Sequence, residues 1–120
     1  MPVSREYLEY VQDLLSVLGP VAAKRMFGGA GLYHNGIFFG LVADDVLYFK
    51  VGDSNRGDYE AAGMGPFRPY GDEGYAMQYY EVPVDVLEDR DLLVAWAEKA
   101  LGVATAKVGL RSKQKKQKKK

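Results

Sequence analysis

The feature of this sequence that most constrains its fold is a pair of two-residue turns set within a run of alternating apolar residues. Asn35-Gly36 is the strongest short hairpin signal available, because both central residues of such a turn need positive φ. Asp44-Asp45 is a weaker turn of the same kind. Together with a break at Gly28-Gly29, these turns predict an antiparallel meander of three or four strands over residues 24–51.

Helical periodicity appears near both ends of the chain. Apolar residues recur at three- and four-residue steps over residues 4–18, which predicts an amphipathic helix capped by Ser4 and ended by Gly19-Pro20. A final helix is expected from a cap at Asp89 to a stop at Gly102. Its buried stripe is expected to comprise Leu92, Leu93, Trp96, Ala97, Ala100 and Leu101.

Shorter elements lie between the meander and the final helix. Asp53 or Ser54 can cap a second helix around residues 59–62. Residues 63–74 are rich in Gly and Pro and are predicted to form a loop. Residues 75–82 then predict another strand, which a single helical turn follows.

This order of elements, α-β-β-β(-β)-α-β-α, predicts a two-layer α+β domain with helices mainly on one face of an antiparallel sheet. Pairing across the two turns gives one wholly apolar face, made of Tyr33, Phe38, Gly40, Val42, Leu47, Phe49 and Val51. The other face is also largely apolar, although a sheet face that helices leave bare is expected to be more polar. We therefore predict an interface with a partner or a second copy, with candidate residues Leu32, Ile37, Phe39, Leu41, Val46 and Tyr48.

The charges of the chain are strongly segregated, although 16 Lys+Arg balance 16 Asp+Glu. Residues 1–106, predicted to be the globular domain, hold all 16 acidic and eight basic residues and carry a net charge of −8. Residues 107–120 are predicted to form a lysine-rich, disordered tail. Its cations are candidate contacts for nucleic acid phosphates without sequence preference, the alternative being a solvated tail: Lys107, Arg111, Lys113, Lys115, Lys116, Lys118, Lys119 and Lys120.

No arrangement of residues indicates catalysis, a cofactor or a metal site. The chain has no cysteine, which excludes a disulfide scaffold, thiolate zinc and a cysteine nucleophile. The single histidine, His34, is interpreted as an exposed residue at a strand end. The glycines of residues 28–31 match neither phosphate-binding pattern and are interpreted as a β-bulge or as positions that let a helix pack close to the backbone.

Two further groups of residues have structural interpretations. The acid pairs Asp44/Asp45 and Asp72/Glu73 suit a turn and a solvated loop. Tyr75, Tyr79 and Tyr80 lack the basic groove that a base-stacking platform needs, so they are predicted to pack in the core or an interface. The N-terminal residues lack an apolar signal core and no run is long enough for a membrane helix, so we expect a cytoplasmic protein without a membrane partner.

An ordered set of short stretches is shared with a known family. It begins with Arg25-Met26-Phe27-Gly28-Gly29 within residues 24–33 and continues through residues 36–43, 47–51, 59–67 and 77–83 to a helix containing Trp96-Ala97. The set covers about residues 5–102 and resembles the N-terminal domain of the TfoX/Sxy family of bacterial competence regulators. The resemblance implies a two-layer α+β fold similar to secretion-chaperone-like domains, and it supplies no catalytic residues.

The resemblance also carries expectations about function. Two-domain members of that family promote transcription of DNA-uptake genes together with the cyclic-AMP receptor protein, and their helical C-terminal domain has no counterpart after Gly102. We therefore expect a stand-alone, non-enzymatic regulatory or adaptor domain that acts through protein contacts, without cofactor or metal. The alternative is a nucleic-acid-binding accessory protein that uses the basic tail. An enzyme or small-ligand binder is a third hypothesis, which a deep polar pocket would favour.

Overall fold

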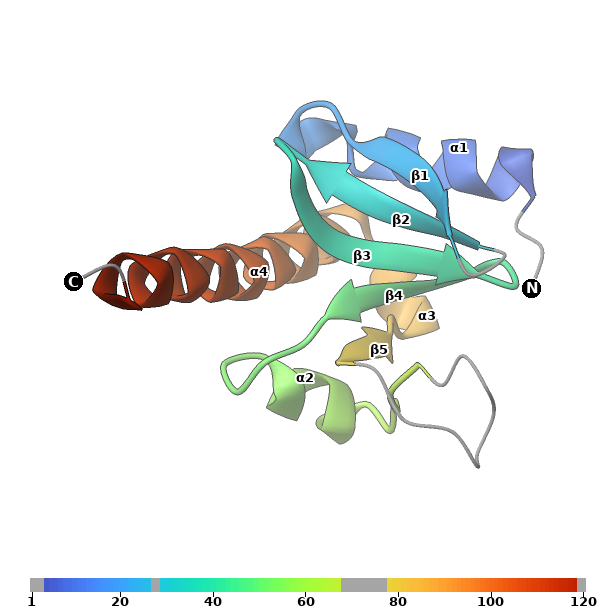
Figure 1. Cartoon of the computed structure of the whole chain (residues 1–120). Helices are drawn as coiled ribbons and strands as arrows, with labels where there is room; N and C mark the ends of the chain where they lie inside the picture. Colours follow the sequence, from blue (N-terminus) through green and yellow to red (C-terminus); the bar gives the residue numbers. More distant parts are fainter. Residues whose placement is uncertain (1–3, 27–28, 68–77, 119–120) are drawn as a thin grey trace.

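The structure, a computed structural model, describes residues 4–26, 29–67 and 78–118, and for residues 107–118 it describes the backbone alone. A five-stranded antiparallel sheet with the order β1-β2-β3-β4-β5 forms one layer, and helices cover one of its faces (Figure 1). The strands are β1 (Ala22–Met26), β2 (Gly29–His34), β3 (Ile37–Ala43), β4 (Val46–Lys50) and β5 (Tyr79–Glu81). The predicted two-layer α+β architecture is confirmed.

Both predicted tight turns form as the sequence indicates. Asn35 and Gly36 have φ values of 51° and 78°, and Asp44 and Asp45 have φ values of 56° and 57°. Positive φ at both central residues matches the twist of the flanking strands, so each turn closes a hairpin. The meander of β2 to β4 is therefore specified locally, by turn chemistry.

The first helix is confirmed over most of its predicted length. Helix α1 (Arg5–Leu14) is capped by Ser4, whose Oγ accepts a hydrogen bond from the Tyr7 amide at 3.1 Å. A short 3₁₀ turn, η1 (Ser16–Leu18), follows α1 and ends at Gly19, where φ is +109°. Chain reversal into β1 therefore begins at the predicted Gly19-Pro20 stop.

The second helix begins later than the predicted caps. Helix α2 (Arg56–Ala61) has Asn55 at its N-cap position, not Asp53 or Ser54. The Asn55 side chain is buried, and its Oδ1 accepts a hydrogen bond from the Gly52 amide at 2.8 Å while its Nδ2 donates to the Lys50 carbonyl at 3.0 Å. Through these two hydrogen bonds, Asn55 links the end of β4 to the start of α2. Residues 68–77, which include part of the predicted loop and strand, lie outside the described residues.

The last two helices are α3 (Val84–Leu87) and α4 (Arg90–Lys118). Asp89 precedes α4 as predicted, and its Oδ1 accepts a hydrogen bond from the Leu92 amide at 3.2 Å. Leu93, Ala97 and Ala100 are buried, and Trp96 and Leu101 pack partly against the core. Leu92 departs from the predicted stripe, because 44% of its surface is exposed.

The predicted stop at Gly102 is wrong, because α4 continues to Lys118. A glycine inside a helix costs only about 1 kcal/mol relative to alanine, and packing beyond it can outweigh that cost. Ala104 is buried and the Val103 side chain lies against Gly52. Residues 107–118 are consequently a helical extension of the domain, which differs from the disordered tail predicted for them.

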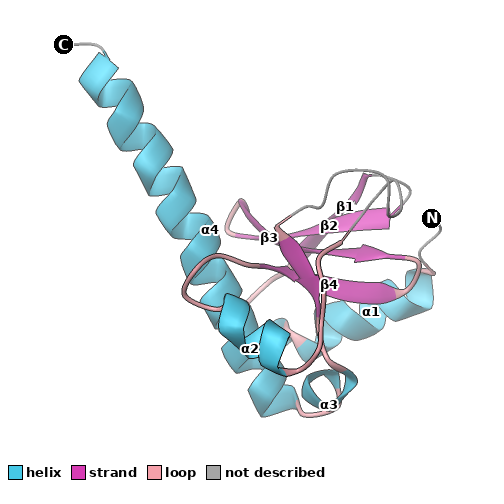
Figure 2. Ribbon diagram, turned by 90° about the horizontal axis from the view of Figure 1, so that it is seen from below, coloured by secondary structure: helices cyan, strands magenta, loops and turns pink. Residues whose placement is uncertain are grey.

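The core lies between the sheet and the helices that cover one of its faces. Figures 1 and 2 show α1 and α4 on this face, with α3 beside the base of α4 and the far end of α4 extending away from the sheet. The largest fully buried side chains come from β2, β3, β4, α2, α4 and the residue that follows α1, and they include Leu15, Leu32, Phe39, Phe49, Tyr59 and Leu93. Among the described residues, no helix is both long enough and apolar enough to span a membrane.

Candidate functional site

A one-residue bulge in β3 determines which side chains face the helices. Tyr33 is paired with Phe38, whereas the preceding residue, Leu32, is paired with Gly40. Phe39 is therefore the extra residue of the bulge, and the alternation of side chains changes phase at this point. Phe39 and Leu32 lie fully buried on the helix-covered face, while Phe38 and Tyr33 lie on the opposite face.

This bulge corrects the predicted interface. Leu32, Ile37 and Phe39 belong to the core on the helix-covered face and do not join the other three candidate residues. The prediction extended a regular register from the Asn35-Gly36 turn, which fails at Phe39. Leu41 and Tyr48 do lie on the face that no described helix covers, and Val46 is paired with Ala43 at its end. We call this second face the helix-free face.

Stacked aromatic rings occupy the helix-free face. The ring centroids of Tyr33 and Phe38 are 5.0 Å apart, and those of Phe38 and Tyr79 are 5.2 Å apart. A lysine lies at each end of this aromatic row: Lys24 Nζ is 5.0 Å from the Tyr33 ring centroid, and Lys50 Nζ is 4.9 Å from that of Tyr79. Both distances are within the range of cation–π attraction, so the row combines apolar surface with positive charge.

The chain itself covers one half of the helix-free face. Phe67 donates its amide to the Tyr79 carbonyl at 2.7 Å, and the Glu81 amide donates to the Gly65 carbonyl at 3.2 Å. The Phe67 ring lies 4.9 Å from the Tyr48 ring, and Tyr79 and Phe67 are both buried. Among the residues that the structure describes, 65–67 thereby cover the β4–β5 half, whereas Ala22 and Lys24 in the β1–β2 half are exposed.

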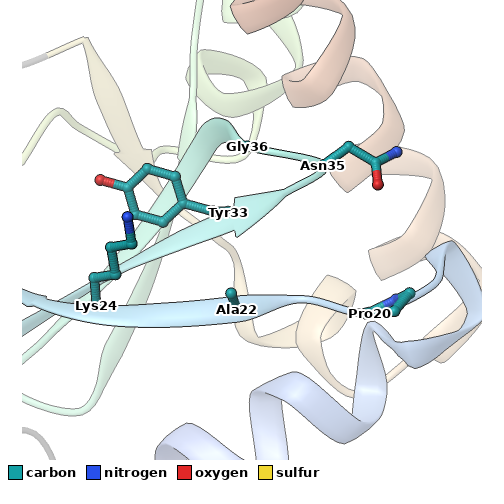
Figure 3. A pocket seen from close by; sticks show the side chains of 6 residues that line it. All are labelled: Pro20, Ala22, Lys24, Tyr33, Asn35 and Gly36. Carbon is teal, nitrogen blue, oxygen red and sulfur yellow. The ribbon is translucent and has the colours of Figure 1, made fainter.

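An open pocket of about 310 Å³ lies in this accessible half (Figure 3). Ala22 and Lys24 reach it from β1 and Tyr33 from β2, and Pro20 and the Asn35-Gly36 turn close its end. In Figure 3 the Lys24 side chain extends along the Tyr33 ring. The pocket therefore offers an aromatic wall beside an ammonium group.

His34 holds this end of the sheet together. Its Nδ1 donates a hydrogen bond to the Pro20 carbonyl at 2.9 Å, and Asn35 Nδ2 lies 3.4 Å from its Nε2. The bond to Pro20 selects the tautomer with the proton on Nδ1, so Nε2 can accept from Asn35. His34 is half-buried and not fully exposed as predicted, and it joins the start of β1 to the β2–β3 turn.

Two phenols of this face, those of Tyr48 and Tyr79, have raised pKa values. Burial raises the pKa of Tyr79 to about 12, with a smaller contribution from Tyr33. Burial, followed by Glu81 and Asp44, raises the pKa of Tyr48. The Tyr79 phenol therefore adds no negative charge beside Lys50, whose Nζ lies over its ring.

The paired acids and the three tyrosines singled out in the sequence do not form one site in the part of the chain that the structure describes. Asp45 occupies its turn and its Oδ1 accepts a hydrogen bond from the Ser4 amide at 2.8 Å. Tyr80 faces the core, with its ring centroid 5.9 Å from that of Tyr59, whereas Tyr79 joins the aromatic row. Tyr75, Asp72 and Glu73 lie outside the described residues.

The last two groups of residues singled out in the sequence are the glycines of residues 28–31 and the basic residues of 107–120. Gly29 does lie close to neighbouring backbone, but the neighbour is strand β3 and not the predicted helix, because a Cβ at Gly29 would lie against the Val42 carbonyl oxygen. Of the candidate nucleic-acid contacts, Lys107, Arg111, Lys113, Lys115, Lys116 and Lys118 lie on the extension of α4. Lys119 and Lys120 lie outside the described residues.

A family model described as the TfoX N-terminal domain matches residues 13–104. This range includes all five strands of the sheet and helices α2 and α3, but only the end of α1 and the first half of α4. No curated protein matches the chain. The matched region contains the aromatic row, both lysines beside it and the pocket.

Proposed function

The chain belongs to the TfoX N-terminal domain family, and from this premise we propose that it is a regulatory or adaptor domain that works by binding another protein. The family is not a known enzyme family. The observation that carries the proposal is the accessible β1–β2 half of the helix-free face, where Tyr33 and Phe38 stack beside Lys24. Aromatic side chains are enriched at the centres of protein interfaces, and a charged side chain at the rim, here Lys24, favours a partner of opposite charge.

The position of β1 indicates what shape of partner fits. β1 is the first strand in the sheet order and pairs with β2 alone among the described strands, so its outer edge can accept a further strand. Ala22 and Lys24 are exposed on β1 and border the pocket. An extended peptide laid along β1 would place one apolar side chain against Tyr33 and an acidic side chain within reach of Lys24. We propose such a peptide as the partner.

A link to transcriptional control of DNA-uptake genes rests on the family resemblance and stays a prediction. In that setting, the peptide would belong to a component of the transcription machinery. Binding of an extended peptide along β1 does not depend on this link, because it follows from the surface of the domain and the chemistry of the peptide.

Photo-crosslinking in the native host tests the proposal. A photoreactive amino acid at Ala22, which is exposed beside the pocket, should capture a discrete protein partner. The same amino acid at Tyr10 serves as the control, because Tyr10 is exposed on α1, away from the sheet face. Capture at Ala22 but not at Tyr10 is the expected result. Equal capture at both positions, or none at Ala22, would contradict the proposal.

A second candidate function, nucleic-acid binding, is favoured by the extension of α4. Residues 107–118 continue the helix away from the sheet, as both ribbon views show (Figures 1 and 2). Residues 107–120 carry eight basic and no acidic side chains. Such a segment suits phosphate contacts, whose strength falls steeply with salt.

Anisotropy titrations with duplex DNA across a salt series test this second candidate. Replacing Lys113, Lys115 and Lys116 by glutamine should flatten the slope of log K against log salt by about 2.7, if all three contact phosphates. The charge-matched control neutralises three exposed basic residues of the globule, Arg5, Arg90 and Lys99. An unchanged slope in the first variant would exclude the α4 extension as the nucleic-acid contact.

A further inference from the structure

The two charged parts of this chain lie at opposite ends of the molecule. Residues 1–106 carry a net charge of −8 and residues 107–120 a charge of +8. In both ribbon views the far end of α4 lies on the opposite side of the molecule from the start of α1 and from α3 (Figures 1 and 2). The chain is therefore electrostatically polar, although its net charge is zero.

An apolar groove with an acidic rim lies at the end opposite the basic extension. The groove has a volume of about 160 Å³ and lies between α1, the start of β4, the end of β5 and α3. Tyr7, Val46, Val84 and Leu87 supply apolar walls, and Asp45 and Glu81 stand beside them. Val84 is 61% exposed, so this groove leaves apolar surface in contact with water.

The electrostatics of the groove are set by these acids. None of the described residues that line the groove is basic. Burial raises the pKa of Tyr7, and Tyr10, Asp45 and Glu81 raise it further, so its phenol remains a neutral hydrogen-bond donor at neutral pH. A segment that fills the groove must therefore combine apolar side chains with positive charge.

The lysine-rich end of this chain has that composition. Residues 107–111 read Lys-Val-Gly-Leu-Arg, and further lysines follow. The extension cannot reach the groove of its own chain, because α4 is continuous from Arg90 to Lys118 and leads away from it. At 1.5 Å per residue, the fourteen residues beyond Ala104, the last one described as buried on α4, extend about 21 Å.

We propose that the basic extension of α4 of one copy binds the acid-rimmed groove of a second copy. Leu110 of the extension covers Val84 and Leu87, and cations on the same helix face, such as Lys113, pair with Asp45 and Glu81. Because the two surfaces lie at opposite ends of the molecule, a pair leaves one groove and one extension unoccupied, so the assembly continues to grow head to tail. This proposal uses a different surface from the peptide site on β1, so either can fail alone.

Sedimentation velocity of the nuclease-treated full chain tests the assembly. At about 0.1 M salt the sedimentation coefficient should rise with protein concentration through a series of species. At about 1 M salt, where the Debye length is about 3 Å, the chain should be monomeric. A monomer at every concentration in low salt would overturn the proposal, and so would a dimer that persists in high salt.

Charge variants locate the contact. Glu81→Lys should weaken self-association at least about tenfold, whereas the same change at Glu60, exposed on α2, should have little effect. If both variants lost self-association equally, the change in net charge alone would explain the loss, and binding at this groove would be contradicted. The circular dichroism spectrum of each variant checks that the fold is retained.

A mixing experiment distinguishes this contact from a symmetric dimer. Glu81→Lys keeps its extension, and a variant with glutamine at Lys113, Lys115, Lys116 and Lys118 keeps its groove. Each variant alone should be monomeric, and an equimolar mixture should form a one-to-one complex that grows no further. A mixture that remains monomeric, for example because the extension binds only nucleic acid, would overturn the proposal.

Discussion

The ring of Phe38 stacks on the ring of Tyr33 across β2 and β3, with centroids 5.0 Å apart and planes inclined by 22°. The next residue, Phe39, is on the opposite side of the sheet and fully buried. The bulge at Phe39 thus divides two adjacent phenylalanines between the core and the helix-free face. The accessible aromatic surface depends on this single irregularity.

Truncating the two phenylalanines should have unequal effects on stability. Phe39→Ala removes a fully buried ring and should lower the free energy of unfolding by about 3–5 kcal/mol. Phe38→Ala should cost about 1–2 kcal/mol, because its ring is only partly withdrawn from water. Denaturant unfolding of both variants measures the difference. A larger loss for Phe38→Ala would place the bulge elsewhere.

The close approach of β2 and β3 should make Gly29 intolerant of a side chain. A Cβ at Gly29 would lie against the Val42 carbonyl oxygen, so Gly29→Ala should destabilise the domain by about 1–3 kcal/mol. Gly57→Ala is the matched control, because Gly57 lies in α2 with open space around it and should gain about 0.5–1 kcal/mol. Thermal unfolding compares the two. Similar effects in both variants would be inconsistent with the strand spacing.

Asn55 should contribute more to stability than the neighbouring Ser54. Asn55→Ala leaves the Gly52 amide and the Lys50 carbonyl without their side-chain partner, which should cost about 1–3 kcal/mol. Ser54 is exposed, so Ser54→Ala should change the free energy of unfolding by less than about 0.5 kcal/mol. If Ser54 were the cap of α2, the order of these two losses would be reversed.

Alkaline pH should destabilise the domain through its buried phenols. The pKa of Tyr79 is about 12 in the folded chain and near its ordinary value of 10 in the unfolded chain. Below pH 10 both states hold the proton. Between pH 10 and 12 the unfolded state loses it first, so the free energy of unfolding falls as pH rises. Tyr79→Phe should show a shallower fall, and an identical fall would contradict the assigned burial.

Much of the fold could be predicted because its signals are local. The turns at Asn35-Gly36 and Asp44-Asp45 depend on residues that tolerate positive φ, and Ser4 caps α1 through a neighbouring amide. The end of α4 could not be predicted in the same way. Gly102 is a stop signal by itself, but the packing of Val103 against Gly52 is a tertiary contact that no local pattern contains.

In the candidate site, too, the residues near a regular turn could be placed from the sequence, and the residues affected by the bulge could not. Leu41 and Tyr48 were assignable to the helix-free face because they lie near the second turn, where the register is regular. Leu32, Ile37 and Phe39 were not, because the bulge between the two turns reverses the alternation. In the sequence, the bulge lies at the adjacent pair Phe38 and Phe39, followed by Gly40. The same pair in a regular strand would place one large aromatic side chain on each face, so the pair alone could not predict a bulge.

The binding site on the β1–β2 half of the helix-free face is tested most directly by measuring how tightly the domain binds the peptide of its crosslinked partner. Lys24→Glu reverses the charge beside Tyr33 without altering the core, since Lys24 is exposed, and should weaken binding at least about tenfold. Arg5→Glu makes the same change in net charge on α1 and should leave the dissociation constant unchanged. Titration calorimetry on the three proteins decides the question. Weakening by Lys24→Glu alone is the predicted result, and equal affinities for all three would contradict a binding site on the β1–β2 half of the helix-free face.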